Sequence, residues 1–389
     1  METRLSESFT IDPDAPWVRR HNAEAAEVLA AYYADAPTRV PLLCGEWYGQ
    51  HGFYADEAGI DYRSYYSDPG EMVRVQLEAA RRRRELPIYD FVLGELPEQW
   101  PVSVDQWPVV VAGWLGCEVV YRRDTVVAHR GLNLSKEACQ ELQMPDPLNG
   151  GLLQTIRRFW EEMRERYEGK LAFLGCPVGP FDHGVGIYGF FSVALDLRGP
   201  QLMSDMYDDP EFARVFLLKV ASWCDLLERT WKGLNGDEVG AYSASDHGIE
   251  MLSPDQYETF IVPAIREMNR RRGTQPSGGL HQCGRGSHLF PVIQRHFGLK
   301  RIHALTHPIV DVARVRRELG DDVWLECCLY DPIVQFGPPE RIRQEVKDLL
   351  TSGAKGRGRF ALIAGDMLKG TPLEHLIAFY ESVKEFGAY

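Results

Sequence analysis

Two hydrophobic patterns alternate along the second half of the chain. Several segments have apolar residues at helical spacing, and most of them precede a short apolar run that suits a buried strand. The helical pattern covers 152–168, 199–207, 210–232, 254–272, 287–297, 311–319, 339–352 and 372–386. The strand pattern covers 171–176, 238–243, 278–284, 301–305, 323–328 and 359–365. This alternation predicts parallel strands that are joined by helical crossovers.

The beginning of the chain is more polar and more helical. An Ala-rich pattern at 23–36 predicts a helix, and 39–45 predicts a short buried strand. No long linker or low-complexity stretch divides the sequence. We therefore expect a helical extension over 1–36 and one domain over 37–389.

Two further segments before the regular alternation have a clear pattern. The segment 68–87 predicts a helix, for which Asp68 is a suitable cap. The segment 108–131 is rich in β-formers and predicts a hairpin that turns at Arg123-Asp124.

The alternating pattern fits two kinds of α/β fold, a doubly wound sheet and a (β/α)8 TIM barrel. No G-x-G-x-x-G segment follows a first strand, and no G-x-x-x-x-G-K-[ST] segment occurs in the sequence. The sequence therefore gives little support to a nucleotide-binding, doubly wound sheet. The predicted fold class is α/β, a (β/α)8 barrel with the N-terminal helical extension.

Composition and charge indicate a globular protein and argue against some classes of binding partner. The 389 residues are 44% hydrophobic and 25% charged, which is typical of a globular chain. A net charge of −13 argues against nucleic acid or an anionic membrane surface as the main partner. The sequence shows neither an N-terminal apolar signal region nor an apolar run of 18 residues, and its 8 cysteines have no disulfide-scaffold spacing. We expect a cytoplasmic protein with reduced thiols.

The sharpest chemical signal is the segment His281-Gln282-Cys283-Gly284, at the end of a predicted strand. A TIM barrel carries its site at the C-terminal ends of its strands. Residues i and i+2 of a strand share a face, so His281 and Cys283 can both face the barrel mouth. Imidazole and thiolate are typical zinc ligands. A buried free cysteine beside a hydrogen-bonded histidine is the structural alternative.

A metal site of this kind needs a third ligand from another strand end. The candidates are Cys327, Cys328 and Asp366. Cys327 and Cys328 are adjacent in a strand, so only one of them can face the barrel interior.

Three further residues are candidates for catalysis. Asp246, His247 and Glu46 lie at predicted strand ends, where they would position a substrate or transfer its proton. Asp246 also suits a turn in which its side chain bonds nearby backbone.

At this point the chain resembles the uroporphyrinogen decarboxylase superfamily, which includes zinc-dependent methyltransferases that act with corrinoid proteins or coenzyme M. The resemblance runs from about residue 60 to the C-terminus. The segments that carry it are Gly179-Pro180-Phe181, Ser253-Pro254-Asp255-Gln256-Tyr257, His281-Gln282-Cys283-Gly284, 329–350 and 370–389.

The resemblance implies a TIM barrel and a cytoplasmic enzyme. Decarboxylase members carry an N-terminal R-Q-A-G-R-Y motif whose arginines bind substrate carboxylates, whereas the corresponding segment 44–52 has no arginine. Porphyrinogen decarboxylation is therefore disfavoured. Methyltransferase members bind zinc through an H-x-C pair, matched by His281 and Cys283, and through a later cysteine. Asp366 stands where that cysteine would be.

These expectations define a leading function and two alternatives. The leading function is zinc-dependent transfer of a methyl group between a small methylated substrate or thiol and a corrinoid, either free cobalamin or one carried by a partner protein. The alternatives are a metal-independent decarboxylase or lyase of a small carboxylic acid, and a non-catalytic tetrapyrrole or corrinoid binder. Homodimers occur in the superfamily, and the sequence leaves the oligomeric state open.

Overall fold

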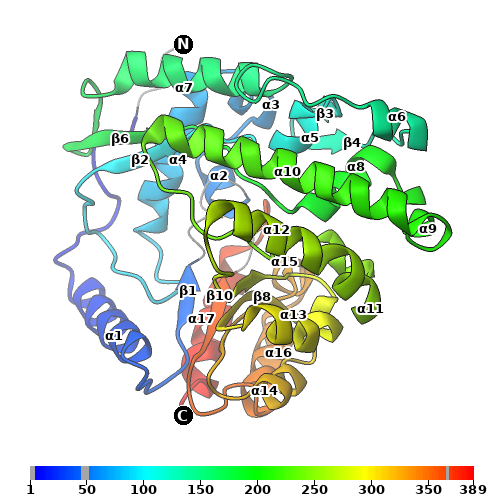
Figure 1. Ribbon diagram of the computed structural model, residues 1–389. Helices are drawn as coiled ribbons and strands as arrows, with labels where there is room; N and C mark the ends of the chain where they lie inside the picture. The colour runs from blue at the N-terminus through cyan, green and yellow to red at the C-terminus, as the bar shows by residue number, and fades with distance from the viewer. Residues whose placement is uncertain (1–4, 45–51, 365–367) are drawn as a thin grey trace.

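A parallel sheet of five strands forms the centre of the lower half of the molecule (Figure 1). The computed structural model of the protein describes residues 5–44, 52–364 and 368–389. The strand order in this sheet is β1-β10-β9-β8-β7, and every neighbouring pair is parallel. The strands are β1 (Leu42–Cys44), β7 (Gly279–His281), β8 (Arg301–His307), β9 (Trp324–Leu329) and β10 (Phe360–Ala364).

Helical crossovers join these strands, as the alternating pattern predicts. In Figure 1, α13, α14, α16 and α17 lie around the five-stranded sheet, while α7 and α10 run across the top of the molecule. The principal helices are α1 (Pro16–Tyr33), α4 (Pro69–Arg83), α7 (Leu153–Tyr167), α8 (Phe190–Arg198), α9 (Gln201–Asp208), α10 (Pro210–Asn235), α12 (Val262–Arg272), α13 (Phe290–Phe297), α14 (Val312–Leu319), α16 (Pro339–Thr351) and α17 (Leu373–Phe386). The shorter helices are α2 (Phe53–Glu57), α3 (Tyr62–Tyr65), α5 (Val110–Trp114), α6 (Lys136–Glu141), α11 (Pro254–Gln256) and α15 (Asp331–Phe336).

The remaining strands form two smaller sheets. β2 (Trp100–Ser103) pairs in parallel with β6 (Cys176–Asp182), which also forms a hairpin with β5 (Ala172–Phe173). β3 (Glu118–Val120) and β4 (Ala128–Arg130) form a separate antiparallel pair. In the described part of the chain, no ladder joins these sheets to the five-stranded one.

Several expected elements are confirmed with small changes in their ends. The helix predicted over 68–87 is α4, and the Asp68 side chain accepts a hydrogen bond from Gly70 N, as expected of a cap. The predicted hairpin is β3–β4. Near the start of the predicted segment 108–131, however, the chain forms helix α5 rather than a strand.

Two strand predictions are corrected. The expected strand 171–176 is broken by Leu174 and Gly175, which both have positive φ, so the chain reverses there and β6 follows. The expected strand 238–243 forms no ladder. Instead, the side-chain amide of Asn269 bonds both the N–H (3.0 Å) and the carbonyl (3.1 Å) of Tyr242. A side chain on α12 thus supplies bonds that a neighbouring strand would otherwise make.

The faces of β9 separate the outer core from the barrel interior. Leu325 and Cys327 belong to the large hydrophobic core, whereas Cys328 packs with Ala304 and Ile363 in a small separate cluster. This alternation is that of a strand with both faces buried. It also settles which of the two adjacent cysteines faces inward: Cys328 lies on the interior face.

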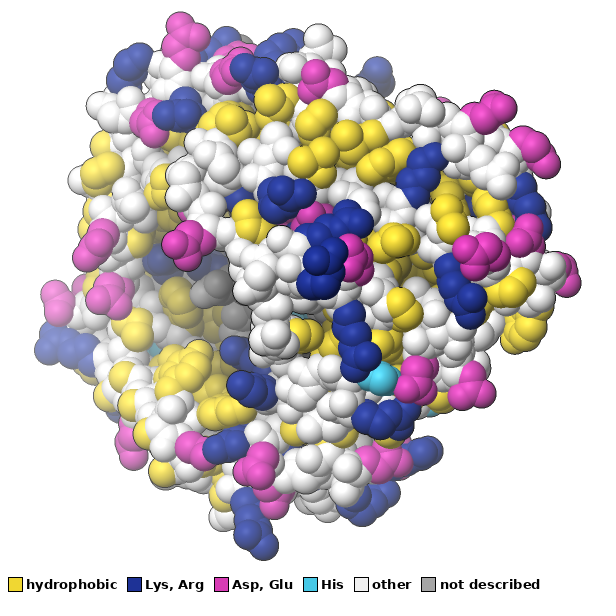
Figure 2. Space-filling model, viewed as in Figure 1, with side chains coloured by type: hydrophobic (Ala, Val, Ile, Leu, Met, Phe, Trp, Pro, Cys, Tyr) yellow, Lys and Arg dark blue, Asp and Glu magenta, His cyan; other side chains and the backbone are white. Residues whose placement is uncertain are grey.

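The surface shows mixed charge. Figure 2 shows basic and acidic side chains interspersed over one face rather than gathered into a patch of one sign. Among the described residues, no helix is both long and apolar enough to span a membrane.

Candidate metal and catalytic site

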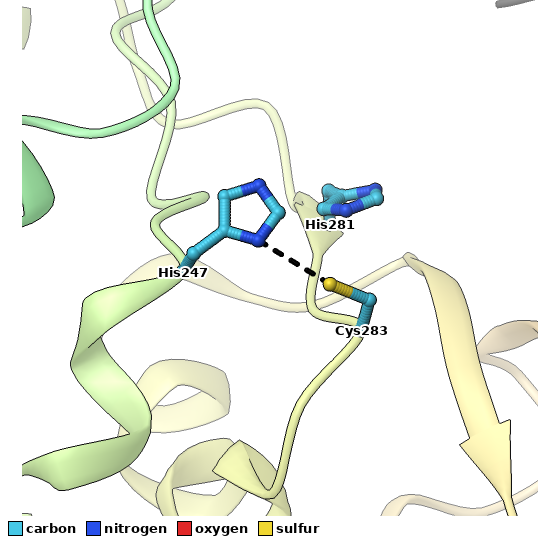
Figure 3. A group of neighbouring side chains, drawn as sticks. All are labelled: His247, His281 and Cys283. Carbon is cyan, nitrogen blue, oxygen red and sulfur yellow. Dashed lines mark hydrogen bonds between the residues drawn. The ribbon is translucent and has the colours of Figure 1, made fainter. Parts of the chain in front are cut away.

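Three side chains with metal-binding chemistry meet at the end of β7. His281 is the last residue of β7, Cys283 follows in the next loop, and His247 directly precedes the 3-10 turn η2 (Gly248–Met251). One ligand atom from each lies within 4.8 Å of the other two. Figure 3 shows Cys283 Sγ pointing toward His247, with His281 beside them, and His247 Nδ1 lies 3.3 Å from Cys283 Sγ. No other such group of three was found in the described part of the chain.

Short hydrogen bonds fix the backbone on both sides of this group. His281 N donates to Ser245 Oγ at 2.8 Å, which ties β7 to the loop that carries His247. Thr306 Oγ1 donates to Cys283 O at 2.8 Å, so the Cys283 loop is anchored to β8. Such contacts hold the ligand-bearing loops in place before a metal or substrate arrives.

Asp246 anchors the other loop through helix α8. Its carboxylate accepts bonds from Phe191 N (2.7 Å), Ser192 N (3.1 Å) and Ser192 Oγ (2.6 Å), and from Gly248 N (3.0 Å). A carboxylate is favoured at a helix N-terminus, where backbone N–H groups are free. Glycine is needed at position 189, because a Cβ there would lie 2.2 Å from Asp246 Cγ. The structure thus places Asp246 beside the site but directs its oxygens at α8.

Desolvation favours the neutral form of both site histidines by lowering their pKa values. Desolvation, together with the nearby His247 and His303, lowers the pKa of His281 to about 4. Desolvation also lowers the pKa of His247, against a smaller opposing effect of Glu250. Burial raises the pKa of Asp246 to about 6, although its four hydrogen-bond donors oppose the shift. A neutral imidazole has a free lone pair, which is the form that binds a metal.

The other predicted ligands lie elsewhere or outside the described residues. Cys327 is fully buried on the outer face of β9, and burial raises the pKa of its thiol. Cys328 faces the interior but lies outside the group of three. Glu46 and Asp366 fall among the residues that the structure does not describe.

The structure adds two features that sequence reasoning missed. His247, taken from the sequence as a catalytic candidate, lies with His281 and Cys283 in the group that could hold a metal ion. His303 lies beside His281, with their Nδ1 atoms 2.9 Å apart. The signal for His303 was present in the sequence, because parallel register pairs the matching positions of neighbouring strands, His281 with His303.

The donor set fits a zinc ion. Two imidazoles and one thiolate are borderline-soft ligands of the kind found in zinc sites with an open fourth position. Ligands about 2.0–2.3 Å from a tetrahedral zinc lie roughly 3.3–3.8 Å apart. The observed 3.3 Å between His247 Nδ1 and Cys283 Sγ is in that range. Cys283 is exposed, so a substrate can reach the site.

Comparison with known proteins gives one family and two named activities. The family profile "Uroporphyrinogen decarboxylase (URO-D)" matches residues 102–386. The chain is 23% identical to a methylated-thiol–coenzyme M methyltransferase of Methanosarcina mazei over 63% of this chain, and the match spans 62% of that relative. It is 24% identical to a uroporphyrinogen decarboxylase of Crocosphaera subtropica over 64% of this chain and 68% of the relative.

A solved structure supports the fold. A methyltransferase from M. mazei superposes with a TM-score of 0.60 and 18% identity, over 93% of this chain and 98% of that one. The (β/α)8 barrel class predicted from the sequence is therefore confirmed, although the ladders of the described strands do not run unbroken around the barrel.

Proposed function

The chain belongs to the uroporphyrinogen decarboxylase family, and we propose that within it the protein is a zinc-dependent methyltransferase. The reaction moves a methyl group between a small methylated substrate or thiol and a corrinoid. The single observation that carries this proposal is the convergence of His247, His281 and Cys283 within 4.8 Å. The methyltransferase relatives in sequence and fold are consistent with it.

The ligand set differs from the one that the sequence suggested. His281 and Cys283 keep their expected roles, and we assign the third position to His247 instead of Cys327, Cys328 or Asp366. His247 is close enough to Cys283 to share an ion with it, at 3.3 Å. Zinc held by these residues would stabilise the thiolate form of a bound thiol at neutral pH.

The protein's own residues would prepare the site for this reaction. Neutral His247 and His281 offer lone pairs, and the exposed position of Cys283 leaves an approach for substrate. Asp246 acts as a positioning residue, since its carboxylate ties the His247 loop to α8. Glu250 has a similar effect on the loop that carries Cys283, because its Oε2 accepts a bond from Arg285 N at 2.5 Å.

The group transfer itself is a displacement at carbon. The thiol sulfur forms a bond to the methyl carbon of a methyl-corrinoid, and the cobalt–carbon bond breaks with its electron pair left on cobalt. The thiol proton passes to solvent. The corrinoid is a reactant, either free cobalamin or one presented by a partner protein.

Metal analysis and a methyl-transfer assay test the proposal together. We expect about one zinc per purified chain and less than ~0.2 equivalents in the His281→Ala and Cys283→Ala variants, because two ligands hold zinc poorly. Methylcobalamin with coenzyme M, and separately with 2-mercaptoethanol, is followed by the absorbance change on demethylation. His296→Ala, on helix α13, where this histidine pairs with Glu258 instead of the site, is the matched control. A metal-free protein whose turnover resists chelators would overturn the proposal.

A metal-independent lyase is the second candidate, favoured by the match to uroporphyrinogen decarboxylases. In that case Asp246, with a pKa raised by burial to about 6, would act in proton transfer. This candidate predicts carbon dioxide release from a small carboxylic acid in the presence of EDTA. It also predicts that Asp246→Asn abolishes that release while Cys283→Ala does not.

A further inference from the structure

A second histidine supports the site from inside the barrel. His303 lies on β8 directly across from His281 on β7, and their Nδ1 atoms are 2.9 Å apart. Two nitrogens at this distance share a single proton, so one ring donates and the other accepts. The contact engages Nδ1 of His281 and leaves Nε2 as its uncommitted ring nitrogen.

An irregularity in β8 helps to aim His303. The register between β8 and β9 shifts between Ile302 and Leu305, and Ala304 within this stretch has a φ of +68°. Such bulges redirect side chains and are common beside functional sites. A non-glycine residue with this φ is strained, which indicates that the surrounding structure holds the bulge in place.

A buried carboxylate lies on β9, across from the stretch of β8 that carries His303. Glu326 on β9 is 1% exposed, and its Oε1 accepts a bond from Arg301. Its Oε2 has no hydrogen-bond partner among the described residues, and its charge acts on His303. A negative charge behind an imidazole favours a proton on the ring nitrogen that faces it. Because His303 Nδ1 faces His281, a proton held on the other ring nitrogen, Nε2, would leave Nδ1 as the acceptor.

We propose that His303, backed by Glu326, is a positioning residue that holds His281 in the Nδ1-protonated tautomer and leaves its Nε2 lone pair for the metal. His303 contacts His281 directly through the two Nδ1 atoms, whereas Glu326 acts on His303 through its charge. Metal-binding histidines generally donate their second N–H to such a partner. This inference rests on the zinc site proposed above.

Variants at position 303 separate a directional hydrogen bond from simple packing. His303→Phe keeps a ring but removes both nitrogens, whereas His303→Asn places an amide oxygen close to the lost Nδ1. Glu326→Gln removes the charge and keeps an acceptor for Arg301. His307→Phe and His307→Asn are matched controls on the same strand, since His307 contacts Glu345 rather than the site. Near-UV circular dichroism checks that each variant folds.

The first readout is nitrogen-15 NMR of the metal-free protein, which reports the tautomer of His281. We expect a single Nδ1–H tautomer in the wild type and a mixture in His303→Phe. His303→Asn should restore the Nδ1–H form, and Glu326→Gln should give a smaller shift toward the mixture. An unchanged His281 tautomer in folded His303→Phe would overturn the proposal.

The second readout is the zinc dissociation constant from competition with a chromogenic chelator. We expect it to rise about 10- to 100-fold in His303→Phe, to recover to within about threefold of wild type in His303→Asn, and to stay within about threefold in the His307 controls. If wild type binds zinc and His303→Phe binds it equally well, the positioning role is wrong and the zinc site stands. If wild type binds no zinc, the proposed function fails, and the NMR result still decides the role of His303.

Discussion

At the scale of single residues, cysteines of this chain differ in exposure and in thiol pKa according to their surroundings. Cys283 is exposed at the end of β7, whereas Cys327 is fully buried in β9, where desolvation raises the pKa of its thiol. A buried thiol stays protonated and inert at neutral pH. Cys283, beside His247, is therefore the cysteine that solvent reaches most readily.

Alkylation mapping tests this difference between cysteines. We expect iodoacetamide to modify Cys283 at least about tenfold faster than Cys139, Cys224 or Cys327, because these three are buried. Zinc added beforehand should protect Cys283, since a coordinated sulfur is not free to react. Peptide mass spectrometry measures both effects, and Cys283 labelling that zinc leaves unchanged would count against its role as a ligand.

A buried histidine away from the site should make stability depend on pH. His183 is 4% exposed and lies between the Trp160 and Trp231 rings, and burial lowers its pKa. As pH falls below about 6.5, the unfolded chain takes up a proton that the folded His183 resists. The stability contribution of a neutral His183 is thus present above that pH and lost below it.

His183→Asn measures this contribution. Asparagine does not titrate, and its amide oxygen can still accept the bond that Val185 N donates to His183 Nδ1. Urea unfolding at pH 7.5 and 5.0 should show wild type losing more free energy of unfolding than the variant on acidification. An equal loss in both proteins would show that His183 is not the group responsible.

At the scale of elements, hydrophobic periodicity predicted the helices and the parallel strands well, because both depend on local pattern and burial. It failed at 238–243, where the partner of the backbone is the side chain of Asn269, which is distant in sequence. It also missed α8, whose N-terminus is capped by Asp246 from another loop. Both features depend on tertiary contacts that a local pattern does not contain.

The candidate site shows the same limit. The H-x-C spacing identified His281 and Cys283, since both lie within one short segment. The third member, His247, comes from a separate loop, and sequence reasoning gave that position to residues of the later strands. The choice among His247, Cys328 and Asp366 depends on where loops meet in space, which one sequence does not specify.

Asn269 provides a test at this scale. Asn269→Leu would leave the N–H and carbonyl of Tyr242 without their partners, so we expect the free energy of unfolding to fall by about 2–4 kcal/mol. Asn269→Asp keeps an acceptor for the N–H and should lose less. Arg270→Ala, on the exposed side of the same helix, should change stability by less than about 0.5 kcal/mol. Denaturant titration compares them, and equal losses in the two Asn269 variants would contradict this account.

At the scale of the whole molecule, a buried ion pair links distant parts of the chain. Asp90 is 2% exposed and accepts bonds from both terminal nitrogens of Arg39 (2.9 and 2.6 Å) and from Leu42 N (2.8 Å). Tyr380 Oη, on the last helix α17, donates to it at 3.0 Å. One carboxylate thus joins the first strand of the barrel to the last helix.

Removing this carboxylate should weaken the whole fold without altering the site. Asp90→Ala leaves Arg39 buried without its main partner, and we expect a loss of about 3–5 kcal/mol. Asp35→Asn removes the charge of the exposed pair with Arg359, keeps a residue type that tolerates the positive φ of position 35, and should cost less than about 1 kcal/mol. Thermal unfolding compares the two. A zinc affinity in folded Asp90→Ala far below that of wild type would show that the site and the frame are coupled.

The most direct test of the central claim is zinc K-edge X-ray absorption on the purified wild-type protein. This account predicts one sulfur and two imidazole nitrogens from the protein in the zinc shell, and only a small residual zinc signal in Cys283→Ala and His247→Ala, because two ligands hold zinc poorly. A shell with two protein sulfurs, or a zinc signal that both variants leave unchanged, would contradict the assignment of His247, His281 and Cys283 as the metal ligands.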